Sequence, residues 1–354
     1  MKSNKIQTIL LVGLVFFSFS FSSLKAIDYP LEIDVIYIRF NHNSNSNSDD
    51  ATSIKKCHDC DVIELEWYPW GQINEPCAYI KNQTNRKIKV LFQHNQNQSQ
   101  SYYFVIGAAV AEGTSFGYVP YKSVYFPSNN NGFSNITTYQ VTGTVPGSVG
   151  KRYVKFAWWC VNYALSMGYT GKHYYYTLLA NPQEPMPVPW IPVLDYACVW
   201  ASGMSAETSA LTDITEGAYD NFPVNYYGWD SHSPYTTCNL TDLLVDGWAD
   251  CRDMSAIVQI FVNAIGGSNT QVRRINGQFY TQLIDPIGSP GWGTTLWNFH
   301  QVAWKSDVWD ACLRLDYSNP RIPVNEDING EYKDDLFDTG YWTPQTPSSY
   351  TAVE

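Results

Sequence analysis

The sequence predicts two domains, an all-β domain followed by an α+β domain, and three observations support this fold class. At 354 residues the chain exceeds the roughly 150 residues of an ordinary domain. Short runs rich in Val, Ile, Thr, Tyr and Phe fill its first half, whereas helical spacing of apolar residues occurs only in the second half. Between the halves, residues 181–193 contain five prolines, which remove amide donors and favour extended backbone. We therefore place a Pro-rich linker at 181–193.

The first domain, residues 27–180, is expected to be a β-sandwich. Its eight candidate strands alternate with segments rich in Asn, Ser, Gly and Pro, and they lie at residues 31–40, 61–67, 88–94, 102–110, 118–126, 136–145, 153–160 and 173–179. This density of short strands is typical of an immunoglobulin-like sandwich. Residues 41–50 contain only Asn, His, Ser and Asp, so we expect a loop there.

The second domain, residues 194–325, is expected to combine helices with a sheet. Apolar and small residues recur at helical spacing in two stretches, which are Ala206, Ala210, Leu211, Ile214 and Ala218, and then Met254, Ile257, Val258, Phe261, Val262 and Ile265. Two glycines follow the second stretch and favour a helix end there. Strand-like runs lie at 270–275, 278–284, 299–304 and 308–315. Residues 326–354, rich in acidic residues, Gly, Pro and Ser, are expected to form a loosely attached tail.

The charge of the chain argues against nucleic acid as a partner. The chain has 33 acidic and 22 basic residues, which gives a formal net charge of −11. A surface that follows a phosphate backbone needs clustered Lys and Arg instead.

The N-terminal segment, residues 1–26, has the pattern of a secretory signal peptide. Lys2 and Lys5 precede an apolar run at 9–17, and small polar residues lead to a suitable cleavage point after Ala26. The run is shorter than the roughly 20 apolar residues that a membrane-spanning helix needs. We therefore expect an exported protein, periplasmic, cell-surface or secreted, without stable membrane insertion after cleavage. A retained signal anchor is the alternative.

The eight cysteines of an exported chain are candidates for disulfides. Cys57 and Cys60 have the spacing of a zinc or redox motif, but no second Cys or His pair of similar spacing follows them. A local disulfide or two free thiols is therefore favoured over a metal site. No metal or other cofactor is expected.

Cys251 stands directly before the second helical stretch, in the segment Gly-Trp-Ala-Asp-Cys-Arg-Asp-Met. It should occupy the first turn of that helix, where free amides and the positive end of the macrodipole favour a thiolate, the nucleophilic form of cysteine. Such a cysteine must be reduced in order to act, so we expect Cys251 to be a free thiol. Chance placement or a disulfide is the alternative.

His300 and Asp310 lie on two strand-like runs joined by a very short turn. A three-residue turn, at 305–307 or 304–306, would place both side chains on one face of the sheet, and a two-residue turn would separate them. Taken singly, a half-buried histidine and a turn-end carboxylate are ordinary features. Together with Cys251 they supply nucleophile, base and orienting acid for acyl transfer.

Three segments carry a resemblance to a known family: Asp-Cys-Arg-Asp-Met-Ser-Ala at 250–256, Phe-His-Gln-Val at 299–302 and Val-Trp-Asp at 308–310. They resemble the core of the transglutaminase-like cysteine enzymes, which have a papain-like Cys, His, Asp triad in this chain order. The resemblance implies a transglutaminase-like (papain-like) α+β core with Cys251, His300 and Asp310 as catalytic residues. Unlike many members, this chain has Gln-Val-Ala after the histidine, and it has no acidic cluster resembling the calcium sites of animal transglutaminases.

The resemblance implies a cysteine-dependent amide hydrolase or acyltransferase acting on a protein, peptide or cell-wall amide. Cys251 would attack the carbonyl, His300 would exchange protons and Asp310 would hold the imidazole tautomer. Tyr226 and Trp248 could line the substrate site or belong to the core. The alternative is an inactive protein of the same fold that binds polysaccharide or protein, favoured by the 13 Trp and 26 Tyr, whose ring faces can stack on sugars.

Overall fold

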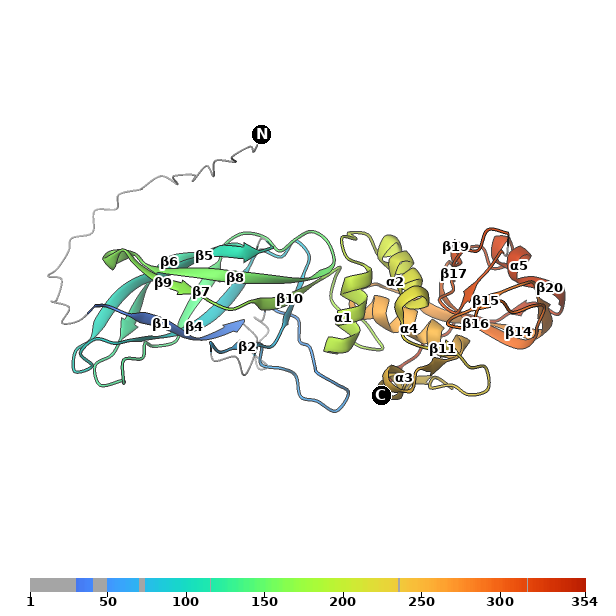
Figure 1. Cartoon of the computed structure of the whole chain (residues 1–354), viewed down its shortest axis with the longest axis horizontal. Helices are drawn as coiled ribbons and strands as arrows, with labels where there is room; N and C mark the ends of the chain where they lie inside the picture. Colours follow the sequence, from blue (N-terminus) through green and yellow to red (C-terminus); the bar gives the residue numbers. More distant parts are fainter. Residues whose placement is uncertain (1–29, 41–49, 70–73, 115, 235, 317) are drawn as a thin grey trace, which may run out of the picture.

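The computed structural model describes residues 30–40, 50–69, 74–114, 116–234, 236–316 and 318–354. The expected signal peptide, and the expected loop except for its last residue, lie outside these residues. The molecule is elongated, with a β lobe at one end and a lobe of helices and sheets at the other (Figure 1). The expectation of a β-rich, multidomain chain is confirmed at this level. Within the described residues, no helix has the length and apolar character needed to cross a membrane.

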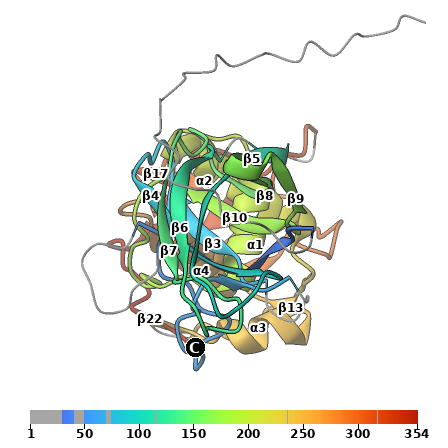
Figure 2. The same cartoon turned by 90° about the vertical axis from the view of Figure 1, so that its left-hand side faces the viewer.

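The N-terminal lobe contains two sheets. The first has the strand order β2 (Glu66–Trp67), β1 (Ile33–Phe40), β4 (Arg86–His94) and β7 (Thr137–Val141). The second has the order β3 (Cys77–Ile80), β10 (His173–Leu178), β8 (Gly150–Cys160), β5 (Tyr102–Gly113) and β6 (Val119–Phe126), with β9 (Leu165–Tyr169) paired to β8. Viewed along the long axis, the sheets lie in front of the helices of the other lobe (Figure 2). Strands β3 and β9 were not predicted, and the strand expected at 61–67 is reduced to β2.

The two sheets pack through aromatic side chains that alternation directs inward. Every second residue of β4 is buried, as a strand with one face on a core requires. The ring of Phe92 on β4 lies 5.4 Å from that of Trp158 on β8, with the planes at a steep angle. The hydroxyl of Tyr139 on β7 donates to the carbonyl of Ile106 on β5 at 3.2 Å. These contacts join the sheets into two facing layers.

Helix α1 (Ile191–Trp200) lies between the lobes (Figure 1). It packs against β8 and β10, and Asp195 accepts a hydrogen bond from the Tyr176 hydroxyl at 2.5 Å. The backbone amide of Leu179, just after β10, donates to the carbonyl of Ile265, just after α4, at 2.8 Å. The end of the N-terminal lobe is therefore bonded directly to the C-terminal lobe.

The C-terminal lobe is built around the buried helix α4 (Cys251–Ala264). Helix α2 (Glu207–Asn221) packs on one side of α4, and strand β16 (Leu296–Lys305) packs on another. The main sheet has the order β19 (Val324–Glu326), β17 (Asp307–Trp309), β16, β14 (Gln271–Thr281) and β20 (Phe337–Gly340), with β21 (Thr343–Pro344) also on β14. The remaining elements are η1 (Val161–Tyr163), α3 (Leu240–Asp246), α5 (Glu331–Leu336), and the strand pairs β11 (Asn225–Tyr226) with β13 (Trp248–Ala249), β12 (Thr237–Cys238) with β22 (Ala352–Val353), and β15 (Asp285–Pro286) with β18 (Leu313–Arg314).

The segment 326–354 corrects the expectation of a loosely attached tail. It contributes α5, β20, β21 and β22 to the C-terminal lobe. Tyr332, Leu336 and Tyr350 are buried, and β22 pairs with β12 in parallel. The acidic and small residues dominate the composition of this segment, but its few large apolar side chains insert into the core and hold it there.

Candidate active site

Cys251 is the first residue of α4, as the sequence predicts. A capping box holds this end of the helix, because the Asp250 side chain accepts from the amides of Arg252 (2.8 Å) and Asp253 (3.1 Å). In return, the Asp253 carboxylate accepts from the Asp250 amide at 3.0 Å. The cysteine therefore stands at a rigid helix start.

His300 and Asp310 meet on one face of the sheet. Strands β16 and β17 pair with Lys305 opposite Asp307 and Trp304 opposite Val308, one of the two registers expected from a three-residue turn. Nε2 of His300 lies 2.9 Å from Oδ2 of Asp310, and the exposed fractions of the two residues are 0% and 1%. The predicted juxtaposition is confirmed.

Two further groups donate hydrogen bonds to the Asp310 carboxylate, and neither was predicted from the sequence. The Tyr332 hydroxyl, from α5, donates to Oδ2 at 2.8 Å, and the backbone amide of Cys312 donates to Oδ1 at 2.8 Å. Burial, reinforced by the charge of Asp310, raises the pKa of Tyr332 well above its ordinary value, so this hydroxyl remains a donor. A carboxylate that accepts three hydrogen bonds has its orientation fixed.

The other nitrogen of the imidazole faces no hydrogen-bond partner among the described residues. In the tautomer whose Nε2 donates to Asp310, Nδ1 of His300 keeps its lone pair. Nδ1 is buried without a partner. The backbone amide of the next residue, Gln301, opposes the rise in the pKa of the Cys251 thiol. Helix α4, which Cys251 begins, packs against the histidine strand β16.

The side chain of Gln301 ties three elements together behind the thiol. Its amide nitrogen lies 2.9 Å from the Ser255 hydroxyl on α4 and 3.0 Å from the Tyr350 hydroxyl in the C-terminal segment. The Tyr350 backbone amide also donates to the Gln259 side chain on α4 at 3.1 Å. These bonds fix α4 against β16, and therefore fix Cys251 relative to His300.

The thiol is neutral in this conformation, contrary to the expectation from its place at a helix start. Cys251 is 2% exposed. Burial raises its pKa well above the ordinary value, the charge of Asp250 adds to the effect, and the Gln301 amide opposes it. Desolvation of the charged form exceeds the favourable amides and helix dipole.

Three aromatic side chains, Trp297, Tyr226 and Trp292, form a cover that packs on His300. The ring of Trp297 lies edge-on to His300 at 4.9 Å, and Tyr226 lies 5.7 Å from Trp297 and 5.3 Å from Trp292. Burial is the main cause that raises the pKa of Tyr226, and a thiolate at Cys251 would raise it further. Tyr226 is therefore a neighbour of the candidate site. Trp292 is half-buried.

A second histidine lies near the start of α4 but is less suited to act as the base. His232 stacks on Trp248 with ring centroids 4.0 Å apart. Its Nε2 is 3.0 Å from Asp246 and its Nδ1 is 3.6 Å from Asp253. Nε2 is bonded to Asp246, whereas Nδ1 faces the Asp253 carboxylate and is buried without a hydrogen-bond partner. Trp248, a candidate for the substrate wall, thus packs on His232.

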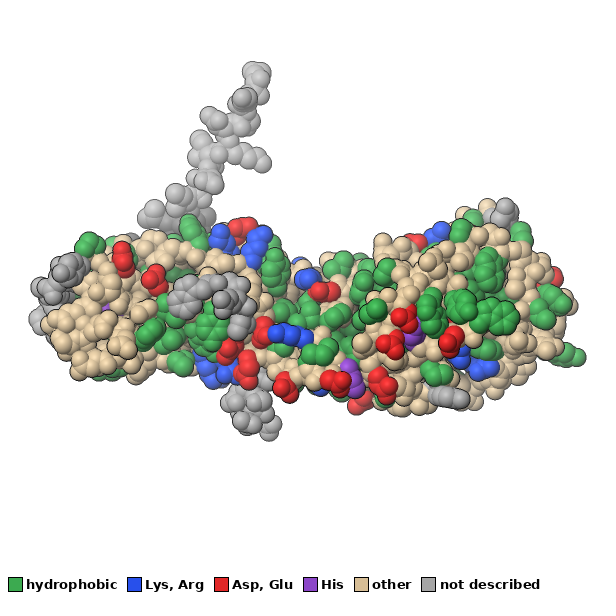
Figure 3. Space-filling view, turned by 60° about the horizontal axis from the view of Figure 1, so that its bottom comes forward, with side chains coloured by type: hydrophobic (Ala, Val, Ile, Leu, Met, Phe, Trp, Pro, Cys, Tyr) green, Lys and Arg blue, Asp and Glu red, His purple; other side chains and the backbone are tan. Residues whose placement is uncertain are grey.

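Exposed hydrophobic side chains occur on the C-terminal lobe, and two of them follow β11. Hydrophobic side chains gather on the face of the C-terminal lobe in Figure 3, with acidic side chains among them. Trp229, which follows β11, is 89% exposed, and Tyr227 is 49% exposed. Large exposed aromatic side chains of this kind are common where proteins bind other chains.

The cysteines agree with the expected thiol state of Cys251. Cys57 and Cys60 form a disulfide, one of the two states favoured for this pair from the sequence. The other six cysteines, Cys251 among them, are free and buried. No group of three or more His, Cys, Asp and Glu in the described part of the chain has the arrangement needed to hold a metal ion.

The chain matches no protein-family model and no curated protein sequence.

Proposed function

We propose that this chain is an exported cysteine-dependent amide hydrolase or acyltransferase whose C-terminal lobe has a transglutaminase-like fold and whose N-terminal lobe is an immunoglobulin-like sandwich. The observation that carries the proposal is the orientation of His300. Its Nε2 lies 2.9 Å from Asp310 and its buried Nδ1 has no hydrogen-bond partner, on a strand that packs against α4, the helix that Cys251 begins. This arrangement supplies a nucleophile, a base and an orienting acid.

The raised pKa of Cys251 implies that proton transfer accompanies attack. As the sulfur bonds to the substrate carbonyl carbon, the thiol proton moves to Nδ1 of His300, and Asp310 stabilises the imidazolium. The tetrahedral intermediate then expels the amine, which takes the proton from Nδ1, and a thioester remains on Cys251. Water or a second amine attacks this thioester and regenerates the thiol, which gives hydrolysis or acyl transfer respectively.

The start of α4 supports one oxyanion donor. The first amides of a helix have no acceptor within the helix. The Asp250 side chain occupies those of Arg252 and Asp253. The Cys251 amide is the donor of this group nearest the sulfur, and it would stabilise the charge on the carbonyl oxygen.

The test is capture of an acyl-enzyme. The purified chain is incubated with a library of peptide, glutamine and cell-wall amides, with and without a primary amine, and the intact mass is followed. We expect a thioester adduct on Cys251 that is absent in Cys251→Ala. The His300→Ala variant should form the adduct about 10²- to 10⁴-fold more slowly. A His232→Ala variant, which removes the other nearby imidazole, should form it at a rate close to that of wild type.

Two outcomes would overturn the proposal. One is turnover that persists in Cys251→Ala, because the chemistry would then not use the thiol. The other is the absence of any adduct together with a Cys251 alkylation rate that His300→Ala leaves unchanged, because the thiol and imidazole would then be uncoupled.

A second candidate function, polysaccharide binding, is favoured by the N-terminal lobe. Tyr103 and Tyr125 pair on neighbouring strands with ring centroids 4.7 Å apart. Tyr103, Tyr121 and Tyr169 are 63%, 58% and 70% exposed. Exposed rings of this kind can stack on sugars. Retention on insoluble glycans that is lost in Tyr103→Ala and kept in Cys251→Ala would support this function.

A further inference from the structure

The disulfide between Cys57 and Cys60 differs from every other cysteine of the described residues in its exposure. Cys57 is exposed and Cys60 is half-buried, whereas the six free cysteines are buried. The two bonded residues are three positions apart, with Cα atoms 5.1 Å from each other. The oxidised pair is thus the sulfur pair most accessible from solvent.

A structural role accounts poorly for this bond. A disulfide stabilises a fold mainly by closing a loop in the unfolded chain, and the shortest loops contribute least. Other contacts already hold the base of this loop. The Ile63 amide donates to Ile54 at 3.0 Å, and Lys56 pairs with Glu75 at 2.8 Å.

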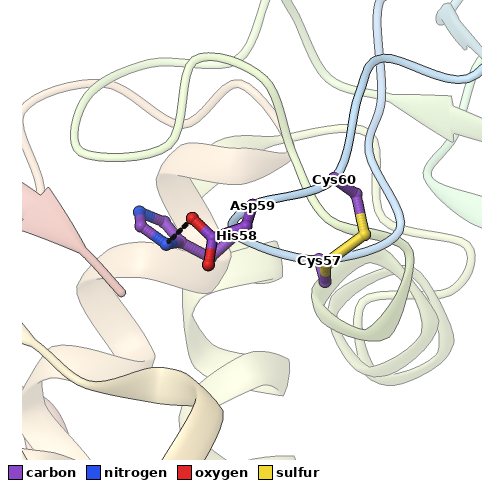
Figure 4. Close-up of a disulfide and its surroundings, with 4 residues drawn as sticks. All are labelled: Cys57, His58, Asp59 and Cys60. Atoms are coloured by element: carbon purple, nitrogen blue, oxygen red, sulfur yellow. Dashed lines mark ion pairs between the residues drawn. A yellow bond between two sulfur atoms is a disulfide. The ribbon is translucent and has the colours of Figure 1, made fainter.

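The side chains within the loop leave the sulfurs uncovered. His58 pairs with Asp59 at 3.0 Å, and this pair lies on the side of the loop away from the disulfide (Figure 4). The ring of His58 faces Trp190 at 5.8 Å. An incoming thiol therefore meets no side chain of the loop itself in front of the disulfide.

The loop also touches the junction between the lobes. The Lys55 amide donates to the carbonyl of Pro189 at 2.9 Å, and the Ile191 amide donates to the carbonyl of Lys55 at 2.8 Å. These two bonds lie on either side of Trp190, the residue that precedes α1. The residues beside the disulfide loop are therefore bonded to the start of α1.

We propose that Cys57 and Cys60 form a thiol–disulfide exchange site whose substrate is an external thiol, from a small molecule or a protein dithiol. The incoming thiolate attacks Sγ of the more exposed Cys57 and forms a mixed disulfide, and Cys60 leaves as a thiolate that takes up a proton. A second external thiolate attacks the external sulfur of the mixed disulfide and releases Cys57. Two external thiols are oxidised to a disulfide, and the pair gains two electrons and two protons.

The exchange is measured in the Cys251→Ala chain, so that the candidate nucleophile contributes nothing and the result does not depend on the proposed function. The oxidised protein is incubated under native conditions with glutathione in one arm, and with thioredoxin and its reductase in the other. Thiols are then trapped with a maleimide and counted by intact mass and peptide mapping. Circular dichroism before and after reduction verifies that the fold persists.

We expect two adducts, on Cys57 and Cys60, formed at least about 100-fold faster than any adduct on the buried cysteines, which react only through local opening. Adducts in both arms would identify a site open to small thiols, and adducts in the thioredoxin arm alone would identify a site for protein dithiols. The Cys57→Ser/Cys60→Ser double variant should give no fast adduct.

The proposal is overturned if the pair stays oxidised in both arms while the protein is folded. It is also overturned if buried cysteines are modified before Cys57 and Cys60, because the bond would then yield only on unfolding. A single-cysteine comparison adds a second readout. Cys60→Ser, which keeps the exposed sulfur, should form a mixed disulfide with oxidised glutathione faster than Cys57→Ser.

Discussion

Replacing Asp310 by asparagine would test whether this residue sets the tautomer of His300. The carboxylate accepts from His300, from the Tyr332 hydroxyl and from the Cys312 amide. Asparagine keeps the shape and retains one oxygen for the Cys312 amide, but presents an NH₂ group to the imidazole. Nε2 must then accept a hydrogen bond, and the ring proton moves to Nδ1. A protonated Nδ1 cannot take the thiol proton, so turnover should fall by about 10⁴, as expected for a wrong tautomer.

The expected loss of stability is smaller in Asp310→Asn than in Asp310→Ala. In Asp310→Asn the Tyr332 hydroxyl loses its acceptor, and a buried unsatisfied group costs about 1–3 kcal/mol. In Asp310→Ala all three donors lose their acceptor, so the free energy of unfolding should fall by about 3–9 kcal/mol on the same scale. Because a domain has only about 5–15 kcal/mol of stability, the alanine variant should fold poorly. Asparagine is therefore the informative change.

Tyr332→Phe is the matched control. It removes one hydrogen bond from the same carboxylate, at about 1 kcal/mol, and leaves the His300 tautomer unchanged. Urea unfolding should give comparable stabilities for the two variants, while acyl-enzyme formation should fail only in Asp310→Asn. If both variants lose the same activity, or if Asp310→Asn acylates like wild type, the tautomer argument is refuted.

Three further changes probe the cover, the helix start and a buried carboxyl. Trp292→Ala should raise the iodoacetamide rate of Cys251 by about tenfold, because local opening limits access, and an unchanged rate would exclude Trp292 as part of the cover. Asp250→Ala removes the cap of α4 and should lower the free energy of unfolding in urea by about 1–2 kcal/mol, with a null effect contradicting the capping role. Burial raises the pKa of Glu326 from 4.5 to about 7, so the native state binds the carboxyl proton more tightly than the unfolded state does. The contribution of Glu326 to the free energy of unfolding therefore falls as the pH rises from 4.5 through 7. Glu326→Gln cannot ionise, so its Tm relative to wild type should increase over that pH range and level off above it, whereas a pH-independent difference would disprove the shift.

The helices show where sequence patterns were sufficient and where they were not. The predicted stretches at 206–218 and 254–265 correspond to α2 and α4, because each has an apolar stripe directed at the core. Helix α1 was missed, since the proline-rich run continues into its first turn with Pro192. A proline in the first turn breaks no helical hydrogen bond, so composition alone did not mark the end of the linker.

Strand β14 was predicted as two strands because a glycine interrupts its pattern. Residues 270–275 and 278–284 are mostly parts of one strand, which shifts register between Asn276 and Phe279. Gly277 has a φ of 128° at this bulge, and a Cβ there would lie 2.1 Å from the Tyr341 carbonyl oxygen. A bulge interrupts the alternation of apolar and polar residues but leaves the strand continuous. The sequence pattern alone therefore cannot distinguish a bulge from a turn.

The part of the candidate site that depends on a single short turn could be predicted from the sequence. The short turn sets the register of β16 and β17, and Ser306 meets it with a φ of 68°. Parity then places His300 and Asp310 on one face. Tyr332 reaches Asp310 from α5, 22 positions along the chain, through a tertiary contact that has no signature in local spacing.

The protonation state of Cys251 depends on two opposing effects, and only one of them is visible in the sequence. The helix start favours a thiolate by about 0.3–2 kcal/mol. Removing a charge from water costs several kcal/mol even after the protein relaxes. In this structure the second effect is larger, and the thiol is neutral. Exposure of the thiol to water would remove part of that cost, while the helix start would keep its contribution.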